Sequence, residues 1–447
     1  QCYNPSAPWR SEVTNRNQLN NYPAANGIAP IEHKYRQMTE NTHVYTSITS
    51  NYLPKARVLA ESVKRVDTSV TFHVVLSDNT PAGFDLDEEP FDNVIFAEEL
   101  VTGNFAQWAF GHSVVELCTA VKGAALAHLL NEKGAGKVFY FDPDMAVFSR
   151  LDELERELDR CSIALTPHLT DPDTTDIGIM DNELSSLLHG VYNLGFIGVR
   201  NSEEGRRFAA WWSERLHKYC HDDLPRGIFT DQKWVDLAPC FFDEVVVLRS
   251  PAYNVATWNI ANRRATGSLE DGILINGEAL GFYHFSGFDS GDQITMLERY
   301  GTESPVLYKL REWYIAECER HGQSALGKLP ARYDSFNSGE KIERGYRLLY
   351  RQREDLKRAF PNPFDVTGSN CFKAWYDAHP EEHPVKGSVQ IDPNAPMYKV
   401  LEDLARYFNG KLVSGHAGGR MRRYTLRIWI RALLLASRVA ARNAVRS

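Results

Sequence analysis

The sequence predicts an α/β protein with a mostly parallel, mixed sheet flanked by helices, followed by a mainly helical C-terminal region. Short β-prone runs alternate with helical segments over residues 41–300, which is the pattern of β-α-β crossover units. Beyond residue 300 the strand-like runs largely stop, and residues 301–447 are polar with helical periodicity. Residues 1–40 are rich in Asn, Pro and Gln and predict an irregular lead-in. We therefore predict three parts, with boundaries near residues 40 and 300.

The predicted elements follow one another from Val44. A helical period over residues 53–66 separates the first two strand-like runs. Ser113 and Glu116 have the spacing of a capping box, which predicts a helix from Ser113 to Leu130. A Trp-rich helix is predicted over residues 203–219. The predicted strands are residues 43–49, 71–76, 93–97, 137–142, 162–167, 191–200, 245–248 and 281–285, and the clearest later helices are 311–320 and 342–360.

Composition limits the classes of function. The 447 residues are 43% hydrophobic and 24% charged, which is typical of a folded globular chain. Fifty Lys and Arg against 58 Asp and Glu give a formal net charge of −8, which disfavours nucleic acid as a partner. The seven cysteines are scattered and form no CxxC pair, so neither a disulfide framework nor a zinc-thiolate cluster is indicated.

The chain shows no sign of secretion or membrane insertion. Its first 40 residues contain no apolar signal region, and no stretch approaches the roughly 18 uncharged apolar residues of a membrane span. We therefore expect a cytoplasmic protein. The start at Gln1 rather than Met suggests a processed protein or a segment of a longer polypeptide, and we favour the segment.

An Asp-Pro-Asp motif, Asp142 to Asp144, follows the apolar strand-like run at residues 138–141. Ligands of open α/β sheets bind at the carboxyl ends of strands, and two carboxylates there suit Mn²⁺ or Mg²⁺. A simple turn is the alternative, because Asp and Pro are common turn residues. A second Asp-Pro-Asp at residues 171–173 follows no apolar strand, and we predict that it forms a loop.

The order of these elements around an Asp-x-Asp motif resembles that of the GT-A glycosyltransferases. The resemblance is greatest to the retaining, family-8-like branch, which includes bacterial lipopolysaccharide galactosyltransferases and glycogenin. It spans about residues 42–290. It implies a Rossmann-like GT-A fold and transfer of a sugar from a nucleoside-diphosphate sugar, UDP-linked in this branch.

The resemblance places four residues at the donor nucleotide. In the loop after the first strand, Thr49, Asn51 and Tyr52 would lie against the base and ribose. Family members often have an Asp in this loop, where this chain has Thr and Ser, so the identity of the base stays open. Lys122 would reach the nucleotide sugar, with a solvated helix lysine as the alternative.

For the metal, the resemblance assigns Asp142 to the nucleotide side and Asp144 to the metal and diphosphate. His284 would complete the site, although a lone His is more often structural. The family's basic residue shortly after this His is missing from residues 286–293, so another group must neutralise the leaving diphosphate.

For the donor sugar, Asn193 and Gly195 match an Asn-x-Gly strand that lies under it, where glycine permits close backbone approach. Asp231 and Gln232 match a pair beside the anomeric carbon, with a helix N-cap at Asp231 as the alternative. Trp258 is a candidate for lining the acceptor cleft, and an acceptor that is a glycan or a lipid-linked glycan is what the resemblance implies.

Several mechanisms and functions stay open. With retention of configuration, the leaving phosphate oxygen takes the acceptor's proton. With inversion, a carboxylate must act as base, and Asp231, Asp171, Asp173 or Asp176 is the candidate. A catalytically degenerate scaffold in a glycan-assembly complex is a non-enzymatic alternative. A haloacid dehalogenase-like phosphatase is disfavoured by Ala146, which stands where that motif has Thr or Val.

The last 28 residues differ in charge from the rest. Residues 420–447 contain eight arginines and no Asp or Glu. Several of the arginines recur at helical spacing, so that a helix of this segment would have a basic side and an apolar side. Such a helix can lie on an anionic membrane surface, which would place the protein at the inner face of the membrane, or it can pack on the acidic remainder or a further domain.

Overall fold

The computed structural model describes residues 41–384. The predicted lead-in at residues 1–40 and the basic segment at residues 420–447 lie outside the described residues, so the expectations for both stay predictions. The division near residue 300 also stays a prediction.

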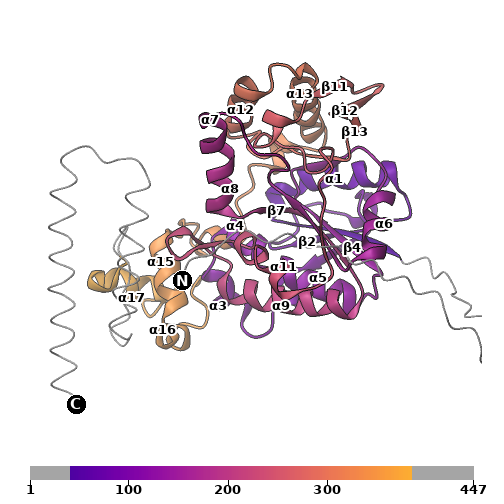
Figure 1. Cartoon of the computed structure of the whole chain (residues 1–447). Coiled ribbons are helices and arrows are strands. Elements are labelled where there is room, and N and C mark those ends of the chain that lie inside the picture. Colours follow the sequence, from indigo (N-terminus) through magenta and orange to yellow (C-terminus); the bar gives the residue numbers. More distant parts are fainter. Residues whose placement is uncertain (1–40, 385–447) are drawn as a thin grey trace, which may run out of the picture. The chain divides into compact units, whose positions relative to one another are not determined.

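A seven-stranded mixed sheet forms the centre of the fold (Figure 1). Its strands lie in the order β10-β6-β7-β4-β1-β2-β3. All neighbours pair in parallel except those of β7, which runs antiparallel to both β4 and β6. The predicted α/β class with a mostly parallel, mixed sheet is therefore confirmed. The strands are β1 Thr42–Ile48, β2 Thr71–Leu76, β3 Asn93–Phe96, β4 Lys137–Phe141, β6 Ile163–Pro167, β7 Tyr192–Arg200 and β10 Val245–Val247.

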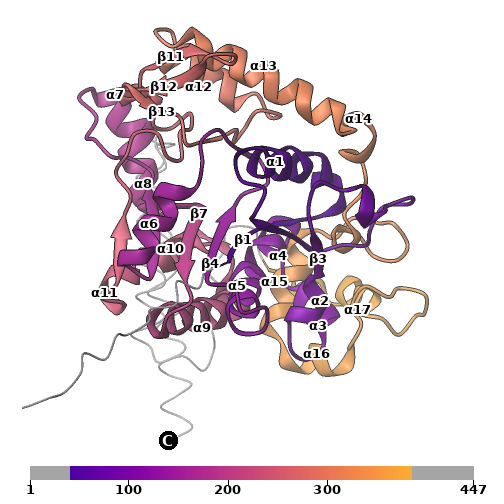
Figure 2. The same cartoon turned by 90° about the vertical axis from the view of Figure 1, so that its right-hand side faces the viewer.

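Helices cover both faces of this sheet, and the alternation of side chains along each strand explains why (Figure 2). Tyr45 and Tyr140 pack against α5 and α9 in one core cluster. Val44 and Phe139, one residue before each, pack against α1 and α6 in a second cluster. The first helices are α1 Leu53–Val66, α2 Ala97–Leu100, α3 Phe105–Phe110, α4 Val114–Ala120, α5 Lys122–Asn131, α6 Asp152–Arg160, α7 Asp176–Gly178, α8 Leu184–His189, α9 Glu203–Tyr219, α10 Gln232–Val235 and α11 Ala238–Phe241.

The capping box predicted at Ser113 is present. The Ser113 side chain accepts from the Glu116 amide, and the Glu116 carboxylate accepts from the Ser113 amide. The helix is interrupted at Val121, where α4 ends and α5 begins. The stretch 114–131 is the one described helical segment long and apolar enough to span a membrane, but 61% of it is buried inside the protein, as expected of core helices.

The antiparallel direction of β7 brings its start to the edge where β1, β4 and β6 end. Phe141 at the end of β4 pairs with Phe196, and Pro167 at the end of β6 pairs with Tyr192. The Asp142 amide donates to the Gly195 carbonyl at 2.7 Å. Residues far apart in the sequence therefore meet at one edge of the sheet.

A small two-stranded sheet returns a later segment to this edge. β14, Phe282–His284, pairs antiparallel with β5, Met145–Val147, so that His284 lies opposite Met145. The Phe285 amide donates to the Asp144 carbonyl at 2.8 Å. The strand predicted at residues 281–285 is thus present but outside the main sheet. The remaining strands are β8 Asp222–Asp223, β9 Ile228–Phe229, β11 Ala265–Ser268, β12 Gly272–Ile275 and β13 Glu278–Ala279.

Helices predominate in the described residues beyond 300. The helix predicted over residues 342–360 is interrupted at Arg353, whose extended backbone separates α15 from α16 while its guanidinium pairs with Asp355 and Glu382. These helices pack around Phe110 and Phe372 in a separate core cluster. The bounds are α12 Asp292–Tyr300, α13 Pro305–Arg320, α14 Gln323–Leu326, α15 Arg344–Gln352, α16 Glu354–Ala359 and α17 Phe372–Ala378.

Two buried histidines predict acid sensitivity of the fold. His43 on β1 and His73 on β2 share a hydrogen bond of 2.9 Å between ring nitrogens. Burial, reinforced by His43, lowers the pKa of His73 from 6.5 to about 3. The unfolded chain binds this proton below pH 6.5 whereas the folded chain does not, so stability falls as the pH drops from 6.5 toward 3. At pH 5 the loss from His73 alone is expected to be about 2 kcal/mol.

The measurement is the free energy of unfolding in urea at pH 7.5 and pH 5.0. His73→Gln should remove about 2 kcal/mol of the difference between the two pH values. His128→Gln is the control, because that ring pairs with the exposed carboxylate of Glu132. Equal pH dependence in the wild type and His73→Gln would contradict the prediction.

Candidate active site

A cavity of about 480 Å³ opens at the sheet edge where β1, β4 and β6 end. Most of the side chains that the sequence singles out line it. They are Thr49, Tyr52, Lys122, Asp142, Asp144, Asn193, Asp231, Gln232, Trp258 and His284. Asn51 does not line the cavity and instead accepts a hydrogen bond of 2.6 Å from the Thr49 hydroxyl. The cavity therefore has the position that ligands take in open α/β sheets.

Two carboxylates and one imidazole meet in this cavity. One ligand atom from each of Asp142, Asp144 and His284 lies within 4.8 Å of the others. The His284 Nε2 atom is 3.2 Å from Asp144 Oδ1 and 4.0 Å from Asp142 Oδ2. Although His284 follows Asp144 by 140 residues, the β5-β14 pairing places it there. This donor set is suited to a divalent cation, and all three residues are those that the resemblance names.

The electrostatics of His284 also favour a cation at this position. Burial opposes charge on the ring, but the carboxylates of Asp144 and Asp142 outweigh burial and raise the pKa of His284 above its usual value. Its Nδ1 atom is buried without a hydrogen-bond partner among residues 41–384, and its ring packs edge-on against Trp258 with 5.1 Å between ring centroids. The carboxylates thus create a negative field that a metal ion would neutralise.

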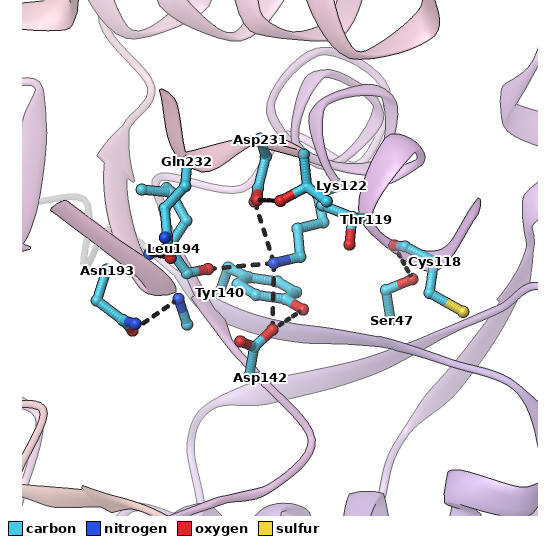
Figure 3. Close-up of polar contacts among 12 residues, drawn as sticks. Ser47, Cys118, Thr119, Lys122, Tyr140, Asp142, Asn193, Leu194, Asp231 and Gln232 are labelled. Atoms are coloured by element: carbon cyan, nitrogen blue, oxygen red, sulfur yellow. Dashed lines mark hydrogen bonds and ion pairs between the residues drawn. The ribbon is translucent and has the colours of Figure 1, made fainter. Parts of the chain in front are cut away.

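Lys122 occupies the centre of the polar network (Figure 3). Its Nζ atom lies 3.1 Å from Asp142 Oδ1, 3.1 Å from Asp231 Oδ2 and 3.2 Å from the Leu194 carbonyl oxygen. It also lies 4.3 Å from the centroid of the Tyr140 ring, and the Tyr140 hydroxyl donates to Asp142 at 2.6 Å. Despite burial, the two carboxylates raise the pKa of Lys122. The alternative of a solvated helix lysine is therefore wrong, since only 6% of its side chain is exposed.

Asp231 stands at the N-cap position of α10, but its side chain does not cap that helix. One oxygen accepts from Lys122 and the other accepts from the Thr230 hydroxyl at 3.2 Å. Burial raises the pKa of Asp231, Asp142 adds to this effect, and Lys122 opposes it. The backbone of Thr230 is in the left-handed region, with φ of 44°. The chain thus turns sharply to present Asp231 to Lys122.

Hydrogen bonds fix Asn193 and Gln232 beside the cavity. Asn193 Oδ1 accepts from the amide of Gly195 and from Asn254 Nδ2, both at 3.0 Å, while its Nδ2 lies 3.1 Å from His168 Nε2. The Gln232 amide nitrogen donates to the His189 carbonyl at 3.2 Å. The sequence reasoning did not identify Asn254 or His168. His168 follows directly after a predicted strand, which was a signal available in the sequence, whereas no local pattern marks Asn254.

Gly195 lies beneath this network, and its missing side chain leaves the space that the network needs. A Cβ atom at this position would come within 2.5 Å of Met145 Cε, 2.8 Å of Asn193 Oδ1 and 2.8 Å of His284 Cε1. Two of these three atoms belong to candidate functional residues. A methyl group at position 195 would therefore clash with side chains of the site and displace them.

We expect Gly195→Ala to lower activity about a hundredfold while the protein remains folded, because displacements of about 1 Å at reacting groups have effects of this size. Circular dichroism would measure the fold, and hydrolysis of the nucleoside-diphosphate sugar that the sequence resemblance implies would measure the activity. Gly368→Ala is the matched control, because its Cβ would meet only one atom, at 4.0 Å. Unchanged hydrolysis in Gly195→Ala would show that the close contacts relax without disturbing Asn193 and His284.

Lys55 is a cation near the site that the sequence reasoning missed. It lies in the first turn of α1, with its Nζ atom 3.8 Å from the centroid of the Tyr52 ring and 2.9 Å from Asp289. Burial opposes its charge, but Tyr52, Asp289 and Asp144 hold the pKa of Lys55 above its usual value. Lys55 in turn helps to lower the pKa of Asp144. Lys55 follows Tyr52 by three residues, which is about one helical turn, and this spacing is the signal that the sequence offered for their contact.

Three acidic residues proposed as alternative bases do not line the cavity. Asp171 and Asp173 belong to the segment between β6 and α7, Asp176 is the first residue of α7, and the second Asp-Pro-Asp motif forms a loop as predicted. Asp173 accepts a hydrogen bond from Asn182 at 3.0 Å, which is a structural contact.

No protein-family model matches the chain. The chain is 28% identical over 220 residues to the uncharacterized protein YfnF of Bacillus subtilis (strain 168), covering 47% of this chain and 70% of YfnF. It is also 28% identical over 208 residues to the uncharacterized protein YfnD of the same organism, covering 45% of this chain and 64% of YfnD. The chain thus spans about two thirds of the length of these relatives.

Solved structures similar to the chain include that of the galactosyltransferase LgtC in complex with donor and acceptor sugar analogues. It is 16% identical, covers 65% of this chain and 97% of LgtC, and has a TM-score of 0.38. The glycosyltransferase GlyE of Streptococcus pneumoniae TIGR4 is 18% identical, with coverage of 66% of each chain and a TM-score of 0.36. Mouse xyloside xylosyltransferase 1 is 14% identical, covering 55% of this chain and 97% of that chain, with a TM-score of 0.32. All three of these proteins are glycosyltransferases by name.

Proposed function

We propose that the protein is a metal-dependent glycosyltransferase. It would move a sugar from a nucleoside-diphosphate sugar, UDP-linked, to a glycan or lipid-linked glycan, with retention of anomeric configuration. The observation that carries this proposal is the meeting of Asp142, Asp144 and His284 in the cavity that also holds Lys122 and Asp231.

The donor set fits Mn²⁺ or Mg²⁺. Asp142 and Asp144 offer the oxygen ligands that these hard cations prefer, and an imidazole beside them is compatible with Mn²⁺ in particular. When bound, the cation would stabilise the negative charge that develops on the diphosphate as the anomeric bond breaks.

The residues around the metal site would bind and orient the donor. The Tyr52 ring and the Thr49 hydroxyl line the cavity and would contact the base and ribose. Lys122 holds Asp142 and Asp231 in position, and with Lys55 it would supply positive charge near the departing diphosphate. Lys55 pairs with Asp289 and does not line the cavity, but its charge beside Asp144 would compensate for the basic residue that is missing after His284.

The hydrogen bonds of Asp231 support retention. Within the described part of the chain, only Asp142, Asp144 and Asp231 bring carboxylates to the cavity lining. Asp142 and Asp144 are assigned to the metal, and both oxygens of Asp231 accept hydrogen bonds. A front-face reaction needs no protein base, because the departing phosphate oxygen accepts the proton of the acceptor hydroxyl. Asn193, Asp231 and Gln232 would stabilise the positive charge that develops on the sugar ring.

A donor screen tests this proposal. Sugar nucleotides are incubated with the protein in the presence of Mn²⁺, of Mg²⁺ or of excess EDTA, and the released sugar is followed by NMR. We expect metal-dependent hydrolysis of one UDP-sugar, with the anomer formed first matching the donor. Initial release of the opposite anomer would favour the inverting alternative with Asp231 as base. Absence of hydrolysis with every donor and both metals would favour the scaffold alternative.

A further inference from the structure

Residues 176–189 form a helical column at the edge of the fold (Figures 1 and 2). The column consists of α7, a π-helical stretch η3 at Ile179–Glu183, and α8, and the backbone is helical through both junctions. One face of the column lines the catalytic cavity with the polar side chains of Asn182, Ser185, Ser186 and His189. Polar residues thus occupy the side of the column that points into the protein.

The other face of the column exposes large apolar side chains. They recur at intervals of three or four residues, which places them on one side of a helix. They are Ile177, Met180, Leu184, Leu187 and Leu188, and each leaves between 51% and 67% of its surface exposed. We call these five residues the apolar stripe. A surface helix normally buries its apolar side and exposes its polar side, so this reversed arrangement is typical of a docking surface.

Acidic residues accompany the apolar stripe. Residues 161–199 contain five Asp and Glu, all between positions 171 and 183, and no Lys or Arg. Arg299 of α12 neutralises Asp181. Asp176, which directly precedes the stripe, is exposed and forms no ion pair with a described residue. The surface around the apolar stripe therefore combines apolar contact with net negative charge.

The basic segment at residues 420–447 has the complementary character. It carries eight arginines and no Asp or Glu. The helix that its sequence predicts has an apolar side with Leu426, Ile430 and Leu434. Its apolar side matches the apolar stripe, and its arginines match the acidic residues beside the stripe. Such complementarity of charge selects one partner over others.

The length of the intervening chain permits this contact within one molecule. Residues 385–419 separate the last described residue from the basic segment, and about 35 residues can extend over about 115 Å. A domain of about 340 residues has a radius of gyration of only about 20 Å. The basic segment can therefore reach the apolar stripe. Because it is tethered, it also has the advantage over the same segment of a second molecule at low protein concentration.

We propose that residues 420–447 dock on the apolar stripe of the same chain. Docking covers the side chains of Leu184 and Leu187 and brings arginines to the acidic residues around Asp176. Two other occupants fit the charges less well. The stripe of a second copy would bring acidic residues of both molecules together, and like charges across an interface disfavour association. The same acidic residues would also repel anionic lipid headgroups.

Hydrogen exchange of the full chain, followed by mass spectrometry, tests this docking. We expect the amides of residues 426–434 to exchange at least tenfold more slowly than in a synthetic peptide of residues 420–447, because docking protects them from solvent. Leu187→Lys adds a positive charge to the stripe and should bring this exchange to within about twofold of the peptide. Met180→Lys should act in the same way. Leu274→Lys is the matched control, since Leu274 is an exposed apolar residue of β12, in another sheet.

Each further outcome decides the inference. The amides of β1 and β4 report whether a variant is folded, and if Leu187→Lys unfolds the protein, Met180→Lys decides alone. Equal protection in the wild type and the folded variant would overturn the docking. Protection that rises with protein concentration would assign the segment to a second copy, and protection only with phosphatidylglycerol vesicles would assign it to a membrane. Both results would overturn docking within one chain. Exchange is measured without substrate, so this test is independent of the proposed function.

Discussion

Replacing Asp144 with asparagine is expected to lower donor turnover by about a thousandfold or more, with little change in folding. Several kcal/mol of charge stabilisation at the diphosphate depend on the cation, and each 1.4 kcal/mol is worth a factor of ten in rate. The Asp144 carboxylate is the one closest to His284, at 3.2 Å, and its side chain is 22% exposed. Asparagine has nearly the same shape but loses the charge that attracts a cation.

The measurement is sugar-nucleotide hydrolysis over a range of Mn²⁺ concentrations, with urea unfolding to verify the fold. Asp171→Asn is the matched control, because it lies in the other Asp-Pro-Asp motif and outside the cavity lining. Full turnover by Asp144→Asn at saturating Mn²⁺ would refute the assignment. Loss of turnover in Asp171→Asn would instead support the inverting alternative.

Replacing Lys122 with methionine should destabilise the protein and abolish turnover. Its ammonium group is shared by Asp142 and Asp231, and methionine would leave Asp231 as a buried carboxylate without a cation. Breaking a buried ion pair in this way costs about 3–5 kcal/mol. We expect a loss of this size in the free energy of unfolding measured in urea, together with loss of donor hydrolysis.

A double variant separates the two effects of this lysine. Lys122→Met with Asp231→Asn removes the uncompensated charge, so much of the lost stability should return while hydrolysis stays absent. A single variant Lys122→Met as stable as the wild type would show that the ion pairs contribute no net stability. Recovery of hydrolysis in the double variant would show that neither residue acts on the donor.

The sequence predicted those parts of the fold and site that depend on local patterns. Ser113 and Glu116 encode a capping box within four residues, and Asp142 and Asp144 follow an apolar strand directly. The antiparallel direction of β7 was not predicted, because direction depends on how the chain crosses the whole sheet. The ion pair of Lys55 with Asp289 was also missed, since it depends on burial and on a partner 234 residues away in the sequence.

Family resemblance, rather than pattern, singled out His284 and Asp231. His284 stands in no local sequence pattern that indicates metal binding. Asp231 stands where a helix begins, and an Asp at that position is explained equally well by helix capping. The structure brings both side chains into the cavity that Asp142 lines, which supports the proposed roles. Asn254 shows the limit of such reasoning, because its contact with Asn193 joins the start of β7 to an irregular segment 61 residues later in the chain.

The pairing of β14 with β5 has a consequence for biosynthesis. The pairing of Met145 with His284 closes a loop of about 140 residues, and closing a loop of this length costs about 4 kcal/mol of chain entropy. A growing chain that has not reached residue 282 can contain every strand of the main sheet, because β10 ends at Val247. It would nevertheless lack the imidazole ligand. On the proposed function, such an unfinished chain lacks one of the three proposed metal ligands, so we expect it to bind the cation weakly and to consume no sugar nucleotide until synthesis has passed this late strand.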